Sequence, residues 1–175
     1  DLPGYKLTDS ELLDMVVGRY QAWKKTIREV APDVANLAKY DSILETNWNP
    51  IKINPHGTIE IRGMDMNFPS LVFAIAVAVK YLYQDVYEHS LHILPSDVGV
   101  AEYFKEEKNT LFVPPDDYVR NKLQYLSAYL GMENDSVHSY CKSFLKLAKR
   151  VTPPASRKLL EPFAEMVDSR KTVSD

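Results

Sequence analysis

Hydrophobic and polar residues recur with helical periodicity over most of the chain. In KLTDSELLDMVVGRYQAWKKTIREV, apolar residues return every three or four positions as far as Val30, which predicts an amphipathic helix. Thr8 followed by Glu11 forms a capping box, so this helix should begin there and end before the break at Pro32. Residues 33–46 predict a second, weaker helix.

Further helices are predicted in the second half of the chain. LVFAIAVAVKYLYQDVYEHSL is apolar on all sides in its first half, which predicts that this half is central and buried. Prolines 114–115, acidic residues in the first turn and Gly131 at the end delimit a helix in DDYVRNKLQYLSAYLG. The next helix, in NDSVHSYCKSFLKLAKR, is capped by Asn134 or Asp135. Pro162 should kink or split the last one, in SRKLLEPFAEMVDSR.

One segment, HGTIEIRGMD, has the period of two that is typical of a strand. Its isoleucines would face a core of helices, and Thr58, Glu60 and Arg62 would face the other way. A strand at about 58–62 needs a partner, either IKIN or TLFV, a second copy, or residues outside this chain. ILPSDVGVAEYFKEEKNTLFVPP predicts irregular or briefly helical structure. We therefore expect an α+β parent protein whose present chain is mainly α-helical, with five or six helices and one strand of an incomplete antiparallel sheet.

Composition narrows the possible partners. The 21 basic and 24 acidic residues give a net charge of −3 and are interspersed, so neither a nucleic-acid face nor a polybasic membrane segment is predicted. The longest apolar run, 71–79, is too short to span a bilayer. The single cysteine, Cys141, excludes an internal disulfide and fits a half-buried thiol in a cytoplasmic protein.

Two interpretations of Glu60 and Arg62 are open. If their face of the strand is solvated, they form a loose ion pair that contributes little. If the face lines a cleft, the carboxylate could hold Mg²⁺ together with phosphate oxygens, and the guanidinium could bind phosphate through its planar fork. Asp65 could add a second carboxylate or cap the following turn. The second interpretation is typical of phosphoryl transfer from a nucleotide.

A weaker candidate is the H-x-x-H pair of His89 and His92, expected near one face of a helix. Because no third ligand is evident nearby, two surface histidines is the favoured interpretation. The chain contains no Walker A, G-x-G-x-x-G or G-x-S-x-G motif.

The segment GTIEIRGMDMNFPS resembles the strand-and-turn signature of the glutamate–cysteine ligase superfamily, the carboxylate–amine ligases. In that family a T-[IVL]-E-[IVL]-R strand is followed by a short turn, an aspartate and often a proline. Thr58, Glu60, Arg62, Asp65 and Pro69 stand at the matching positions.

The resemblance implies an ATP- and Mg²⁺-dependent ligase. In the type reaction the γ-carboxylate of glutamate is phosphorylated, and the amine of cysteine then displaces phosphate from the acyl phosphate. Glu60 would bind Mg²⁺ and bridge the nucleotide phosphates, Arg62 would be the catalytic residue at the transferring phosphate, and Asp65 would support the turn. The partners would be amino acids and ATP.

The resemblance covers a short part of a longer family pattern. Because family members are much longer and this chain begins at Asp1 rather than methionine, we expect residues 1–170 to be a single domain forming the C-terminal half of a ligase. A disordered tail would follow at 171–175. The missing N-terminal half would supply further metal carboxylates, so this chain should be inactive alone. A catalytically inactive relative and a helical interaction module remain alternatives, and an exposed sheet edge would permit a homodimer.

Overall fold

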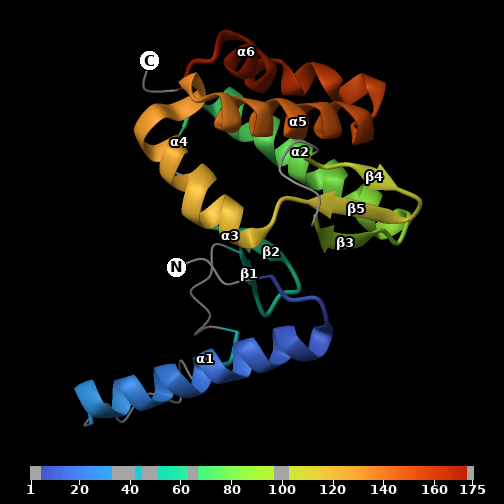
Figure 1. The fold of residues 1–175 in the computed structure, drawn as a ribbon. Coiled ribbons are helices and arrows are strands. Elements are labelled where there is room, and N and C mark those ends of the chain that lie inside the picture. The colour runs from blue at the N-terminus through green and yellow to red at the C-terminus, as the bar shows by residue number, and fades with distance from the viewer. Residues whose placement is uncertain (1–4, 33–41, 45–50, 63–66, 97–102, 173–175) are drawn as a thin grey trace. The chain divides into compact units, whose positions relative to one another are not determined.

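The computed structural model describes residues 5–32, 42–44, 51–62, 67–96 and 103–172 (Figure 1). The chain divides into two compact units, Asp1–Asp65 and Met66–Asp175. The described residues are mainly helical and carry two small sheets of two and three strands, so the predicted α+β character is confirmed. Of the weak helix predicted at 33–46, only 42–44 are described, and they do not form a helix. Residues 173–175 of the predicted tail lie outside the described residues.

The first unit begins with α1, Asp9–Val30. The Thr8 hydroxyl accepts a hydrogen bond from the backbone N–H of Glu11 at 3.2 Å, which confirms the predicted start. The Glu11 carboxylate accepts in return from the N–H of Leu7 at 2.9 Å, one residue earlier than in the usual capping box. No residue of α1 is buried, but most of the predicted apolar stripe is half-buried, namely Val16, Tyr20, Trp23 and Ile27.

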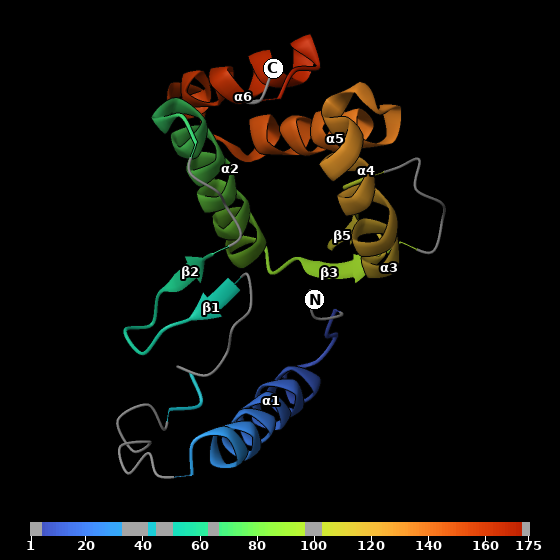
Figure 2. The ribbon, with the colours of Figure 1, turned by 90° about the vertical axis from the view of Figure 1, so that its left-hand side faces the viewer.

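The same unit contains an antiparallel hairpin of β1, Ile51–Ile53, and β2, Ile59–Ile61. The predicted strand is therefore present, and its partner is the IKIN segment, one of the candidates that the sequence offered. Figure 2 shows the two strands side by side, joined by a short turn. The register pairs Ile51 with Ile61, Lys52 with Glu60, and Ile53 with Ile59.

The second unit is built on helices. They are α2, Pro69–Glu88; α3, Asp116–Tyr118; α4, Gln124–Leu130; α5, Asp135–Val151; and α6, Glu161–Ser169. A π-helical turn, Val119–Leu123, joins α3 to α4, and 3-10 segments lie at Gly131–Glu133 and Pro154–Leu160. Figure 2 shows α5 and α6 stacked on each other, with α2 crossing them at one end. In the described residues, no helix is both long enough and apolar enough to span a membrane.

Local sequence signals determine where these helices begin and end. Asn134 caps α5, since its side-chain oxygen accepts from the N–H groups of Ser136 and Val137 at 3.0 and 3.3 Å. Gly131 ends α4 with a φ of +53°. Pro162 lies in the first turn of α6, directly after the 3-10 segment, so the predicted split of the last helix is confirmed.

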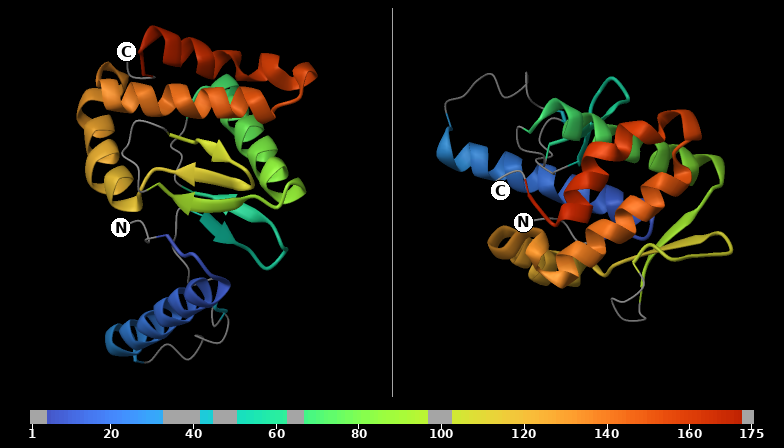
Figure 3. Two further views of the ribbon diagram at one scale, coloured as in Figure 1. Left: turned by 45° about the vertical axis from the view of Figure 1, so that its right-hand side comes forward. Right: turned by 90° about the horizontal axis from the view of Figure 1, so that it is seen from above.

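The second unit also contains a three-stranded sheet in a region that the sequence predicted to be irregular. Its strands are β3, His92–Pro95, β4, Glu106–Glu107, and β5, Thr110–Val113, in the order β3-β5-β4. β3 runs parallel to β5, and β4 runs antiparallel to it (Figure 3, left). The prediction of irregular structure was therefore wrong, except that TLFV, which is β5, was among the candidate strands. Strands of two to four residues are too short to establish a periodic pattern.

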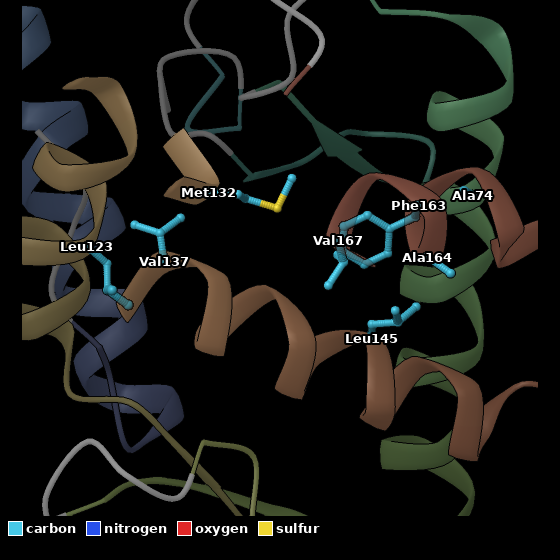
Figure 4. Packing of buried hydrophobic residues seen from close by; sticks show 8 residues of the cluster. All are labelled: Ala74, Leu123, Met132, Val137, Leu145, Phe163, Ala164 and Val167. Carbon is cyan, nitrogen blue, oxygen red and sulfur yellow. The ribbon is translucent and has the colours of Figure 1, made fainter. Parts of the chain in front are cut away.

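The core of the second unit lies where α2, α5 and α6 meet. Figure 4 shows Phe163 and Ala164 of α6 close to Leu145 of α5 and Ala74 of α2. α2 buries only its alanines, Ala74 and Ala78, whereas Phe73 is 67% exposed. The prediction that the first half of this helix is buried on all sides was therefore wrong. Ile75 and Val77 pack half-buried beside these alanines, whereas Val72 and Phe73 are exposed. The full cluster comprises Ala74, Leu123, Met132, Val137, Leu145, Phe163, Ala164 and Val167.

Candidate functional site

The turn between β1 and β2 fixes how the hairpin strands are aligned. The N–H of Asn54 donates to the carbonyl of Thr58, and the N–H of Gly57 donates to the carbonyl of Asn54, both at 3.0 Å. The side-chain oxygen of Asn54 also accepts from the N–H of His56 at 2.9 Å. Gly57 has a φ of +74°, in the left-handed region that glycine adopts without strain. These bonds hold the register that places charged side chains of the two strands opposite one another.

Glu60 lies on β2, and Arg62 directly follows the last residue of this strand. Arg62 donates from Nε to Oε1 of Glu60 at 3.0 Å and from Nη2 to Oε2 at 3.3 Å. The pair is thus a bidentate fork rather than a loose contact, although the side chain of Glu60 is 46% exposed and that of Arg62 is 29% exposed. The third predicted site residue, Asp65, lies outside the described residues.

Lys52 of β1 stands directly opposite Glu60 in the register. Side chains in such a cross-strand pair have Cβ atoms roughly 4.5–5.5 Å apart and lie on the same face. Lys52 is only 5% exposed, which is uncommon for lysine unless an anionic group is near. Sequence reasoning missed this residue. The alternation in IKI was the signal that could have identified Lys52. Placing Lys52 opposite Glu60, however, also requires the exact length of the turn between the two strands.

Among the described charged side chains of the paired strands and Arg62, Lys52 and Arg62 are positive and Glu60 is negative. Glu60 therefore does not stand as an isolated carboxylate. Both of its oxygens accept from Arg62, and a lysine lies across from it on the neighbouring strand.

The opposite face of the hairpin is apolar and exposed. The exposed fraction of its four isoleucines ranges from 37% for Ile61 to 54% for Ile53. The expectation that this face packs against helices was therefore wrong. A two-stranded ribbon has no second layer of its own, so the apolar face stays uncovered unless another element lies on it.

The other predicted candidates do not form a site. His89 follows the last residue of α2 and His92 opens β3, so the two histidines do not share a helix face. His89 Nδ1 lies 3.1 Å from Oδ1 of Asp85 instead. Among the described residues, no group of three histidines, cysteines or acidic residues could hold a metal ion. Cys141 is half-buried, as predicted, and burial raises the pKa of its thiol.

Two polar clusters in the second unit were not predicted, and we interpret both as structural. Arg150 of α5 contacts Glu106 of β4 and lies 3.8 Å from Asp85 of α2, so it connects three elements. The hydroxyl groups of Tyr103 and Tyr118 lie 3.1 Å apart. Burial, together with this bond, raises the pKa of Tyr103 well above its usual range.

Comparisons with protein-family models, curated proteins and solved structures found no significant match to this chain.

Proposed function

We propose that the hairpin forms one wall of the nucleotide site of an ATP- and Mg²⁺-dependent carboxylate–amine ligase of the glutamate–cysteine ligase type. The observation that carries this proposal is the bidentate Glu60–Arg62 pair, on the charged face of a strand whose motif resembles that superfamily. By the same resemblance, the substrates are ATP, a carboxylate such as the γ-carboxylate of glutamate, and an amine such as that of cysteine.

Glu60 is the residue that would hold Mg²⁺. This ion is commonly bound by one or two carboxylates, with phosphate oxygens and water completing its coordination, and it neutralises phosphate charge when bound. Glu60 provides one carboxylate, the lower end of that range. Both of its oxygens now accept from Arg62, so at least one of these two hydrogen bonds must be given up when a cation binds.

Releasing that bond would free the guanidinium of Arg62 for the transferring phosphate. In the proposed reaction an oxygen of the carboxylate attacks the γ-phosphorus of ATP, the bond to the β-phosphate oxygen breaks, and ADP leaves. The amine then attacks the acyl carbon, loses a proton and expels inorganic phosphate. Arg62 would stabilise the charge on the phosphoryl group during its transfer, which is the main contribution a protein makes to this chemistry.

Isothermal titration calorimetry of Mg-ATP binding to this chain tests the site. We expect Glu60→Gln and Arg62→Ala each to weaken binding about tenfold or more, because each removes charge-assisted hydrogen bonds or a metal ligand. A matched control is the exposed ion pair of Lys105 and Glu107, 2.7 Å apart on the other sheet. Lys105→Ala and Glu107→Gln should bind like the wild type. Unchanged affinity in both hairpin variants, with folding intact, would refute the proposal.

A catalytically inactive relative is the second candidate. It is favoured by the single carboxylate of the charged face and by the lack of a three-ligand metal group in the described residues. Phosphate release with glutamate and cysteine, measured on the full product of the gene, separates the two. A steady rate supports the ligase, whereas Mg-ATP binding without phosphate release supports the inactive relative.

A further inference from the structure

The solvent-facing sides of α5 and α6 carry charges of opposite sign. The lysines of α5 and the acidic residues of α6 are all exposed, and in each helix they follow the same spacing of four and then three residues. Residues at this spacing lie along one side of a helix, here over a length of about 10 Å. The basic stripe comprises Lys142, Lys146 and Lys149 of α5, and the acidic stripe comprises Glu161, Glu165 and Asp168 of α6.

Both stripes point away from the core of their own molecule. α5 buries Val137 and Ala148, and α6 buries Phe163 and Val167. At 3.6 residues per turn, these apolar side chains lie roughly 140° around each helix from the stripe. In the described part of the chain, no ion pair joins one stripe to the other, although the two helices are neighbours. Pairing of the two stripes therefore requires another molecule.

Each stripe is unfavourable for the helix that carries it. Like charges three and four residues apart destabilise a helix, because they are neighbours on its surface. The acidic stripe matches the basic stripe in length, spacing and number of charges. A complementary stripe of this kind would compensate all three charges at once, and such complementarity also fixes the alignment of two surfaces.

We propose that this chain associates with a second copy of itself, with the basic stripe of α5 in one molecule binding the acidic stripe of α6 in the other. The occupant is a second copy because the chain itself carries the matching stripe. Exposed ion pairs contribute little individually and are screened by salt, so the association is weak and confined to low ionic strength. This inference is independent of the proposed ligase function.

Zero-length cross-linking with a carbodiimide tests the contact, because this reagent joins a lysine amine to a carboxylate only where the two touch. An equal mixture of ¹⁴N- and ¹⁵N-labelled chains distinguishes contacts between molecules from contacts within one. We expect stripe-to-stripe cross-links that contain one peptide of each isotope at about 10 mM salt, and at least about fivefold fewer at about 1 M, where screening is nearly complete. The Lys105–Glu107 pair, 2.7 Å apart, is the control and should cross-link within one molecule.

Charge reversal gives a second readout, the decrease of the translational diffusion coefficient with protein concentration at about 10 mM salt, measured by NMR. One variant replaces the three lysines of the basic stripe by glutamate, and another replaces the three acidic residues of the acidic stripe by lysine. Each should lose the concentration dependence. The sixfold variant that carries both sets should regain it, because it restores complementarity at the wild-type net charge. The triple control Lys6→Glu, Lys25→Glu and Arg28→Glu, at exposed positions in the first unit, should behave like the wild type.

The outcomes are decisive in either direction. Mixed-isotope cross-links between the stripes, with recovery of association in the sixfold variant, would support the proposal. If the control pair cross-links but the stripes do not, or if they cross-link only within one molecule, the proposal is wrong. It is also wrong if the sixfold variant stays monomeric while the wild type associates. Circular dichroism reports whether each variant remains folded, and the cross-linking of the wild type does not depend on any variant.

Discussion

The hairpin and the helical unit differ in which side chains they bury. In the helical unit, Leu160 and Val167 are fully buried in two hydrophobic clusters, and Phe144 packs against both clusters. In the hairpin, the isoleucines are exposed and the enclosed side chain is Lys52. The helical unit therefore has an internal source of stability, whereas the hairpin depends on its turn and its cross-strand hydrogen bonds. A segment organised in this way is better suited to presenting charged groups than to stabilising the fold.

The largest effect that tests this contrast should come from the core. Leu160 is completely buried, whereas its neighbour Leu159 is 44% exposed. We expect Leu160→Ala to lower the free energy of unfolding by about 2–5 kcal/mol, through lost burial and the cavity left behind. Leu159→Ala is the matched control and should cost less than about 1 kcal/mol. Urea unfolding followed by circular dichroism measures both, and equal losses would contradict the assignment of Leu160 to the core.

A smaller effect distinguishes the two left-handed glycines. A Cβ atom at Gly131 would lie 2.7 Å from Cγ2 of Thr172, while a Cβ at Gly57 would meet no atom within 4 Å. Both residues have positive φ, so alanine is strained at each, at a cost of roughly 1 kcal/mol. Gly131→Ala should therefore lower the melting temperature more than Gly57→Ala does. The opposite order would show that the hairpin turn is the more constrained of the two.

The smallest expected effect is a loss of stability at alkaline pH. The folded state holds the proton of Tyr103, because burial and the bond to Tyr118 raise its pKa, whereas the unfolded chain releases that proton near pH 10. This contribution to stability is complete below about pH 10 and is lost as the pH rises further. In Tyr103→Phe the alkaline decrease in melting temperature should be shallower. Tyr125→Phe, at a position that is 61% exposed, should follow the wild type, and identical profiles for all three proteins would contradict this role of Tyr103.

Features that depend on a few neighbouring residues could be predicted from the sequence. The Thr8 cap, the Asn134 cap and the split at Pro162 each follow from side-chain and backbone chemistry within one turn, and the structure confirms all three. The β2 strand was identified from its alternation, and IKI was among its candidate partners. Such signals are local, so no knowledge of the tertiary fold is needed to interpret them.

Features that depend on distant residues could not be predicted in this way. The parallel pairing of β3 with β5 joins residues 18 positions apart, such as His92 and Thr110, and no local pattern specifies it. The one-sided packing of α2 depends on which helices lie against Ala74 and Ala78. In the candidate site, Glu60 and Arg62 were identified because they belong to one predicted strand. Lys52 was missed because its place opposite Glu60 is set by the pairing and not by the sequence around either residue.

The bonded turn at Asn54–Thr58 has a consequence for how this site could change over evolutionary time. Seven residues, 53–59, separate Lys52 from Glu60, and this number decides which side chains share a face. Substitutions within the loop that preserve its hydrogen bonds would leave the charged face intact. Deleting or inserting one residue would turn the side chains of one strand over and bring Lys52 to the isoleucine side. In homologous chains we therefore expect the length of this loop to vary less than its composition.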